Sequence, residues 1–168
     1  MSKLLALICE STACQWNRCA AGAGGSININ AGTFTTTAGT PKFTANGGIG
    51  GNDTSRSAGG AGGRIAFYYT TITGLSVDTT LSTAYGANMR NDGSAGTIFY
   101  KKATDTDGHL LIDNNSIVGT NLEGARILSP GSANIDFDTV TIDNAGVLTQ
   151  ETNAYDITIQ TLTILEQV

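Results

Sequence analysis

The stretch Gly63-Arg64-Ile65-Ala66-Phe67 decides the fold, because its pattern occurs three times in the chain. Gly25-Ser26-Ile27-Asn28-Ile29 comes before it and Gly96-Thr97-Ile98-Phe99-Tyr100 after it, and Gly124-Ala125-Arg126-Ile127-Leu128 is a weaker fourth copy. In each copy a glycine and one or two variable residues precede apolar residues at alternating positions. This alternation indicates a half-buried strand, and recurrence at roughly 30–40 residues indicates a repeat architecture.

The C-terminal third keeps the period of two. Leu110-Leu111-Ile112-Asp113-Asn114 resembles Val140-Thr141-Ile142-Asp143-Asn144, and Ile157–Ile164 alternates apolar residues with threonine apart from one slip. The Asp-Asn pairs after the first two runs are typical of turns. We therefore expect an all-β chain, with no long helix after residue 22.

Two architectures fit short alternating strands: a parallel β-helix (β-solenoid), and a β-sandwich or jelly roll. The repeats favour the β-solenoid, because stacked windings must place like residues above like residues. The sequence predicts an N-terminal cap segment over residues 1–22 and a solenoid domain over residues 23–168. In such a domain, the three Gly-x-Ile segments would be neighbouring strands that run in the same direction.

Composition excludes several classes of function. The chain has 168 residues, a net charge of −5, 14% charged residues and 7% aromatic residues. The pI of about 4.6 gives no basic field for nucleic acid. No stretch approaches the ~18 apolar residues of a membrane span. The apolar run Leu4–Cys9 is shorter than the core of a secretory signal, which takes about 7–15 apolar residues.

The cysteines recur every five residues, at Cys9, Cys14 and Cys19. This spacing does not match a zinc site, which prefers closer pairs and a fourth ligand. Small buried residues, one internal disulfide and an intermolecular disulfide stay open as alternatives. We expect no cofactor and no metal.

Three segments together resemble a known class of repeat: Gly59–Tyr69, Ser94–Lys101 and Leu110–Asn114. They are similar to the glycine-rich parallel β-helix repeats of large bacterial cell-surface proteins, such as adhesins and autotransporter passengers. The resemblance implies an extracellular or cell-surface location and a structural or adhesive role.

Several residues are candidates for chemistry, and each also has a structural interpretation that we favour. Asp105-Thr106-Asp107-Gly108 begins like a calcium loop but lacks the distal glutamate. The other candidates are side chains that a solenoid face would present. Asp136 and Asp138 could form an acid–base pair, and Arg64, Lys101, Lys102 and His109 could act as bases. Stacking on sugars would use Tyr68, Tyr69, Tyr85 and Tyr100, and ice binding would use Thr35–Thr37, Thr141, Thr158, Thr161 and Thr163. The glycine runs 47–51 and 59–63 are interpreted as loops or turns that let windings pack closely, and not as phosphate-binding loops, since no Gly-Lys-Ser/Thr follows.

The leading hypothesis assigns no catalytic, cofactor or metal residues. It describes a structural or adhesive module, not an enzyme, that forms a homo-oligomer or filament through open solenoid ends. The strong strand Ile157–Leu165 would be one such end. The alternative is a carbohydrate-binding or polysaccharide-degrading β-helix protein, whose partners would be surface glycans.

Overall fold

Every regular element in the described part of the chain is a β-strand, which confirms the all-β prediction. The computed structural model describes residues 6–8, 20–35, 42–50, 57–73, 82–118, 124–127, 134–150 and 155–165. Within these ranges no helix has the length and apolar character needed to cross a membrane.

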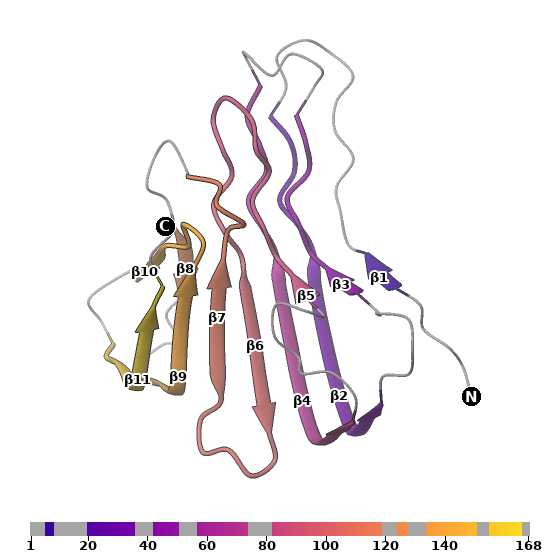
Figure 1. The fold of residues 1–168 in the computed structure, drawn as a ribbon, viewed down its shortest axis with the longest axis vertical. Helices are drawn as coiled ribbons and strands as arrows, with labels where there is room; N and C mark the ends of the chain where they lie inside the picture. The colour runs from indigo at the N-terminus through magenta and orange to yellow at the C-terminus, as the bar shows by residue number, and fades with distance from the viewer. Residues whose placement is uncertain are drawn as a thin grey trace.

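Six long strands form one sheet (Figure 1). In spatial order they are β11 (Ile157–Ile164), β9 (Ile135–Asp143), β7 (His109–Asp113), β6 (Thr97–Lys102), β4 (Arg64–Thr73) and β2 (Ser26–Thr35). Shorter strands form two further sheets: β1 (Ala6–Ile8), β3 (Lys42–Thr44) and β5 (Ser82–Thr83) in one, and β8 (Ala125–Ile127) and β10 (Leu148–Gln150) in the other. Of the eight strand pairings in the described chain, seven are parallel. A sandwich or jelly roll is instead built from antiparallel sheets.

The repeated segments pair in the register that the sequence predicts. Ile27 pairs with Ile65, and Ile65 pairs with Ile98, all in parallel. The second repeat type behaves alike, since Leu110–Asp113 pairs in parallel with Val140–Asp143. The alternation in β11 slips between Ile159 and Leu162, and β9 has the same irregular spacing at the paired positions, because Ile159 pairs with Phe137 and Leu162 pairs with Val140. The prediction that the three Gly-x-Ile segments are neighbouring, same-direction strands is therefore confirmed.

The structure departs from an uninterrupted stack at one place, the β6–β7 hairpin. These two strands pair antiparallel, with Ile98 opposite Leu111 and Phe99 opposite Leu110. Strands β2, β4 and β6 consequently run one way, and β7, β9 and β11 run the other way (Figure 1). The weak fourth repeat lies beyond this reversal, so Ala125–Ile127 pairs with Leu148–Gln150 and not with the first three copies.

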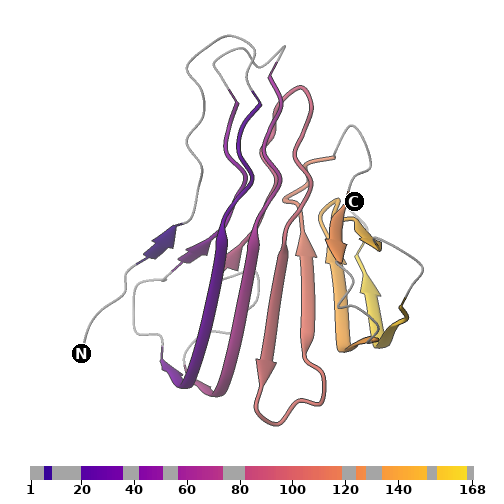
Figure 2. The same cartoon turned by 180° about the vertical axis from the view of Figure 1, so that it is seen from behind.

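The reversal also moves the hydrophobic core to the other face of the sheet. Ile98 and Leu111 belong to a first core, which includes Phe43 from β3. Leu110 belongs to a second core, which includes Ala125 from β8. Consecutive strand residues point to opposite faces, so the two cores lie on opposite sides of the same sheet. The short strands β3 and β5 lie beside the first half of the long sheet, and β8 and β10 lie beside the second half (Figures 1 and 2).

A rule of chain geometry explains why direction and face change together. Connections between parallel strands of one sheet are almost always right-handed. If the strands reversed while the return path stayed on the same face, the hand of the connections would reverse. Moving the return path to the opposite face restores it. The two halves of the chain therefore wind with the same hand.

The described glycine-rich segments, residues 45–50, 59–63 and 84–96, lie between the regular strands and contact one another through their backbones, and we call them the glycine walls. Gly51 of the first predicted run lies outside the described residues. Along the stack, Gly24 N–H donates to Ala61 O at 2.8 Å and Gly62 N–H donates to Ser94 O at 2.9 Å. Between facing walls, Gly63 N–H donates to Ala45 O at 2.7 Å. A Cβ atom at Gly62 or Gly63 would collide with a backbone carbonyl group. Glycine is needed here because the walls contact each other backbone to backbone, so the prediction of close packing was correct.

The predicted N-terminal cap lies mostly outside the described residues, as do Cys9, Cys14 and Cys19. Its described part includes Ala6–Ile8, which pairs in parallel with Lys42–Thr44. This stretch of the cap segment thus extends the sheet of β3 and β5.

Candidate functional site

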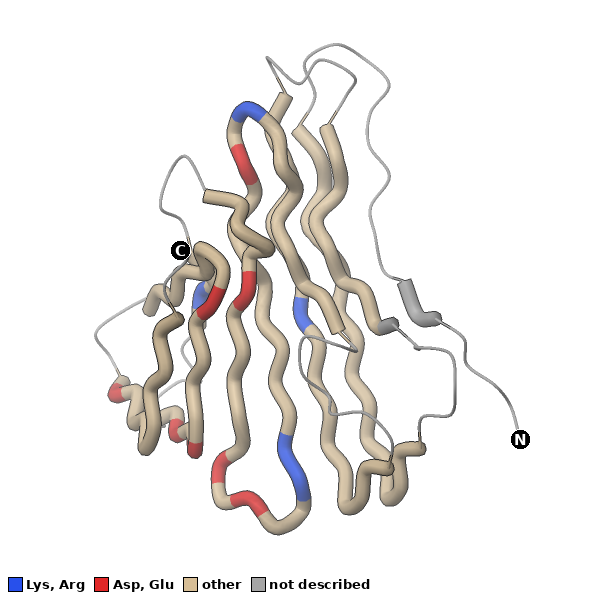
Figure 3. Tube along the Cα trace, in the orientation of Figure 1, with Lys and Arg blue, Asp and Glu red and all other residues tan. Residues whose placement is uncertain are grey.

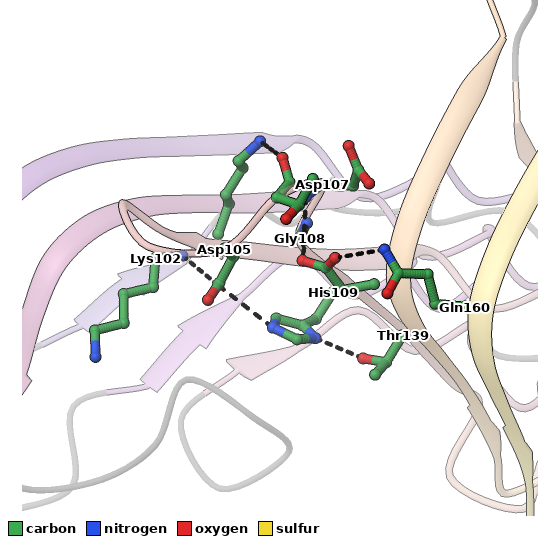
Figure 4. A network of polar contacts seen from close by, with 10 residues as sticks. Lys102, Asp105, Asp107, Gly108, His109, Thr139 and Gln160 are labelled. Atoms are coloured by element: carbon green, nitrogen blue, oxygen red, sulfur yellow. Dashed lines mark hydrogen bonds and ion pairs between the residues drawn. The ribbon is translucent and has the colours of Figure 1, made fainter.

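Polar side chains gather at the β6–β7 hairpin, where the chain reverses. Figure 3 shows basic and acidic residues side by side at this end of the sheet. We call this cluster the hairpin network. Its members come from β6, the connecting loop, β7, β9 and β11 (Figure 4): Lys101, Lys102, Asp105, Thr106, Asp107, Gly108, His109, Asp138, Thr139 and Gln160.

Asp138 fastens the hairpin loop to the second half of the sheet. Its Oδ2 accepts hydrogen bonds from the N–H groups of Gly108 at 2.9 Å and Asp107 at 3.1 Å. Its Oδ1 accepts one from Gln160 Nε2 at 3.1 Å. The Gly108 and Asp107 N–H groups hold the pKa of the Asp138 carboxyl below its ordinary value, with a smaller contribution from His109.

His109 lies between a carboxylate and a hydroxyl group. Its Nδ1 is 2.6 Å from Thr139 Oγ1, and its Nε2 is 3.3 Å from Asp105 Oδ2. Its ring stacks on Tyr100 with 4.9 Å between centroids. With the proton on Nε2, the imidazole donates to Asp105 and accepts the hydroxyl hydrogen of Thr139. Asp105 lies four residues before His109 in the same hairpin, whereas Thr139 is brought to it by the pairing of β7 with β9, which the sequence did not indicate.

Carboxylate, imidazole and hydroxyl are the three groups of a hydrolase triad, in which the carboxylate orients the imidazole and the imidazole activates the hydroxyl as the nucleophile. Such catalysis also takes backbone N–H donors that stabilise an oxyanion. Two N–H groups of this loop, from Asp107 and Gly108, already bind the Asp138 carboxylate. The arrangement as it stands ties the hairpin to β9 and β11.

The basic candidates lie at opposite ends of their strands. Lys101 Nζ donates to Thr106 O at 2.6 Å, and the Lys102 N–H donates to Asp105 Oδ2 at 2.7 Å. Arg64 is exposed at the first position of β4 and pairs with Thr97 at the start of β6. The structure therefore separates Arg64 from Lys101 and Lys102 along the sheet.

The acidic candidates are divided in the same way. Asp138 belongs to the hairpin network, whereas Asp136 is exposed on β9 beside Thr158. In the described part of the chain, no three His, Cys, Asp or Glu side chains are arranged to hold a metal ion.

The tyrosines differ in exposure. Tyr68 is 39% exposed and contacts the ring of Phe99 at a tilted angle of 55°, with 5.7 Å between ring centroids. Tyr69 and Tyr100 pack against the first core. Tyr85 is partly buried, and burial raises the pKa of its phenol, with Asp113 and Asp143 adding to the effect. Of the four predicted sugar-stacking residues, Tyr69, Tyr85 and Tyr100 are thus partly buried and contribute to packing.

Threonines pair across strands more regularly than the sequence indicated. Thr33 and Thr35 of β2 lie beside Thr71 and Thr73 of β4, and Thr139 and Thr141 of β9 lie beside Thr161 and Thr163 of β11. Each group spans two strands. Thr36 and Thr37 lie outside the described residues.

Asn114 is a structural residue that the sequence analysis did not single out. Its side chain is 2% exposed. Its Oδ1 accepts a hydrogen bond from Gly86 N–H at 2.8 Å, and its Nδ2 donates to Ile117 O at 2.7 Å and to Gly93 O at 3.3 Å. The side chain thus joins the turn after β7 to the glycine walls of the first half. Its place in an Asp-Asn turn was the available signal, but its burial was not evident from it.

Comparison of the chain with protein families, with curated proteins and with solved structures gives no match.

Proposed function

We propose that this chain is an extracellular structural or adhesive module, built as a parallel β-solenoid, that self-associates through the open ends of its stack. The observation that carries the proposal is the parallel, in-register pairing of successive windings in two sheets. Ile27, Ile65 and Ile98 follow one another in the long sheet. Thr44 pairs with Thr83 in the second sheet. A winding of this kind buries little by itself and gains stability by stacking.

The glycine walls support a mechanical role. Gly60 N–H donates to Gly48 O at 3.0 Å, and Gly93 N–H donates to Ala87 O at 2.9 Å, in the glycine-rich part of the fold. A backbone that is hydrogen-bonded to neighbouring segments cannot fit into the active site of a protease unless it first unfolds locally. Rigidity and protease resistance are what an exposed scaffold requires.

The hairpin network supports a scaffold more than a polysaccharide-degrading activity. An acid–base pair would use Asp136 and Asp138 as free carboxyl groups. Both carboxylate oxygens of Asp138 accept hydrogen bonds from the loop or from β11. The extracellular location and the adhesive role rest on the resemblance to the glycine-rich repeats of bacterial surface proteins.

Limited proteolysis of three matched proteins tests the scaffold. A Cβ atom at Gly60 would collide with the carbonyl of Gly22, whereas one at Gly32 meets no atom within 4 Å. The wild type and Gly32→Ala should resist thermolysin within the stack, and Gly60→Ala should be digested at least tenfold faster. Equal digestion of all three proteins would contradict the proposal.

Two further measurements test the rest of the proposal. Light scattering at increasing concentration should show self-association, and a strict monomer would contradict that part. Cleavage of an acidic polysaccharide by the wild type, lost in Asp136→Ala, would replace the scaffold with the enzymatic alternative.

A further inference from the structure

Strand β11 forms one outer edge of the long sheet and carries uncovered apolar side chains. Leu162, Ile164 and Leu165 are 52%, 64% and 49% exposed. Leu162 pairs with Val140, which is fully buried in the second core, and Ile164 pairs with Ile142, which packs against that core. Paired residues of neighbouring strands point to the same face. Leu162 and Ile164 therefore occupy core positions in the last strand of the stack, with no described neighbour to cover them.

Among the residues that the structure describes, this edge has none of the features that keep exposed strands from pairing. Outer strands are usually protected by charged residues, proline or a covering segment. Ile157–Ile164 contains no charged residue and no proline. The strand is tan along its length in Figure 3, next to strands and loops that carry acidic residues. Two copies of the strand can meet without placing like charges opposite one another, although the whole chain carries a net charge of −5.

The opposite outer strand is a poorer partner. Ile27 on β2 is only 4% exposed, and none of the large apolar side chains exposed in the described chain lies on β2. A head-to-tail contact between β11 and β2 would therefore bury exposed apolar surface on one side alone. A contact between two β11 strands buries such surface on both sides.

We propose that two copies of this chain join through β11 in a closed, two-fold dimer; the inference rests on the self-association proposed above and specifies its interface. A two-fold axis perpendicular to the sheet pairs the strands antiparallel and keeps both second cores on the same side. Leu162 and Ile164 of one copy then meet those of the partner. The chain itself contains one antiparallel strand pairing, between β6 and β7, although the cores there lie on opposite faces of the sheet. Closure of the dimer leaves no β11 edge for a filament.

Charge substitutions on the strand test this interface, with light scattering as the measurement. The wild type should have twice the chain mass of 17.3 kDa. Leu162→Lys and Ile164→Lys should each weaken the dimer at least tenfold, and both side chains are exposed enough for the fold to be kept, which circular dichroism checks. Val118→Lys is the matched control, because Val118 is 68% exposed and lies outside the strands. It should leave the dimer intact.

Mixing complementary variants tests the two-fold symmetry. Leu162→Lys and Leu162→Asp should each be monomeric alone and should form a dimer when mixed, because a two-fold contact brings the same strand from both copies together. A head-to-tail contact gives no such rescue. A wild-type dimer with no rescue, or filaments that persist in Leu162→Lys, would overturn the β11 interface while leaving self-association in place. A wild type that stays monomeric would overturn both.

Discussion

Ile98 and Phe99 follow one another along β6 but pack against different hydrophobic cores, on opposite faces of the sheet. Across the hairpin, Ile98 pairs with Leu111 and Phe99 pairs with Leu110, so the first pair belongs to the first core and the second pair to the second core. The hairpin is thus the place where the two halves share a sheet without sharing a core. Several expectations for stability follow from this division.

Substitutions in the two cores should act independently. Ile65 in the first core and Ile112 in the second are 1% and 0% exposed. Ile65→Val and Ile112→Val should each lower the free energy of unfolding by about 1 kcal/mol. Because the residues share no packing partners, the double variant should lose the sum to within about 0.5 kcal/mol. Urea unfolding measures these values, and a coupling energy above about 1 kcal/mol would show that the cores are not separate.

Asn114→Ala should destabilise the chain strongly. The substitution leaves the Gly86 N–H and the Gly93 and Ile117 carbonyl groups without the partners they have in the fold. Buried groups that lose their hydrogen bonds cost about 1–3 kcal/mol each, so a loss of about 3 kcal/mol is expected in urea unfolding. Asn30→Ala is the control, since Asn30 is exposed on β2 and its loss should change stability by less than about 0.5 kcal/mol. Equal effects at both sites would contradict the role of Asn114.

Asp138 should make stability depend on acid pH. Hydrogen bonds from Gly108 and Asp107 lower the pKa of Asp138 from its ordinary value of 3.8. A carboxyl group with a lowered pKa in the fold stabilises it above the unfolded pKa, and this contribution is lost as the pH falls through the folded pKa. The Tm of the wild type should therefore exceed that of Asp138→Asn at pH 7, and the difference should shrink below about pH 4. Thermal unfolding across this range checks the expectation, and a pH-independent difference would count against it.

Asp113 should have the opposite effect. Burial raises the pKa of Asp113 from 3.8, and the nearby Asp143 adds to this, although hydrogen bonds from Asn115 and Asn144 act the other way. A raised pKa means that the fold favours the protonated carboxyl, so its stabilising contribution is present below the unfolded pKa and is lost as the pH rises through the folded pKa.

Asp113→Asn should consequently raise Tm at pH 7, and the gain should disappear below about pH 4. The asparagine keeps an oxygen that can accept the Asn115 N–H bond made by Asp113 Oδ1 at 2.8 Å. Asp136→Asn is the control because Asp136 is exposed, and it should leave Tm nearly unchanged. A lower Tm for Asp113→Asn at pH 7 would show that the charged form stabilises the turn.

Local pattern alone determined the strands and their neighbours within each half. The alternation in Ile65-Ala66-Phe67 sets which side chains are buried, and the similarity of Gly25–Ile29, Gly63–Phe67 and Gly96–Tyr100 sets the register in which they stack. The slip between Ile159 and Leu162 was also visible, because side-chain alternation along a strand depends on sequence spacing alone.

Tertiary structure decided the direction of β7, the face of the second core and the contacts of His109. A period-two pattern is the same whichever way a strand runs, so Leu110–Ile112 gives no sign that it pairs antiparallel with β6. Once that hairpin forms, the hand of the connections requires the return path to change faces. Asp105 is only four residues from His109 in the hairpin, but Thr139 is 30 residues away in the chain and is brought to the ring by the pairing of β7 with β9, a proximity that spacing in the sequence does not encode.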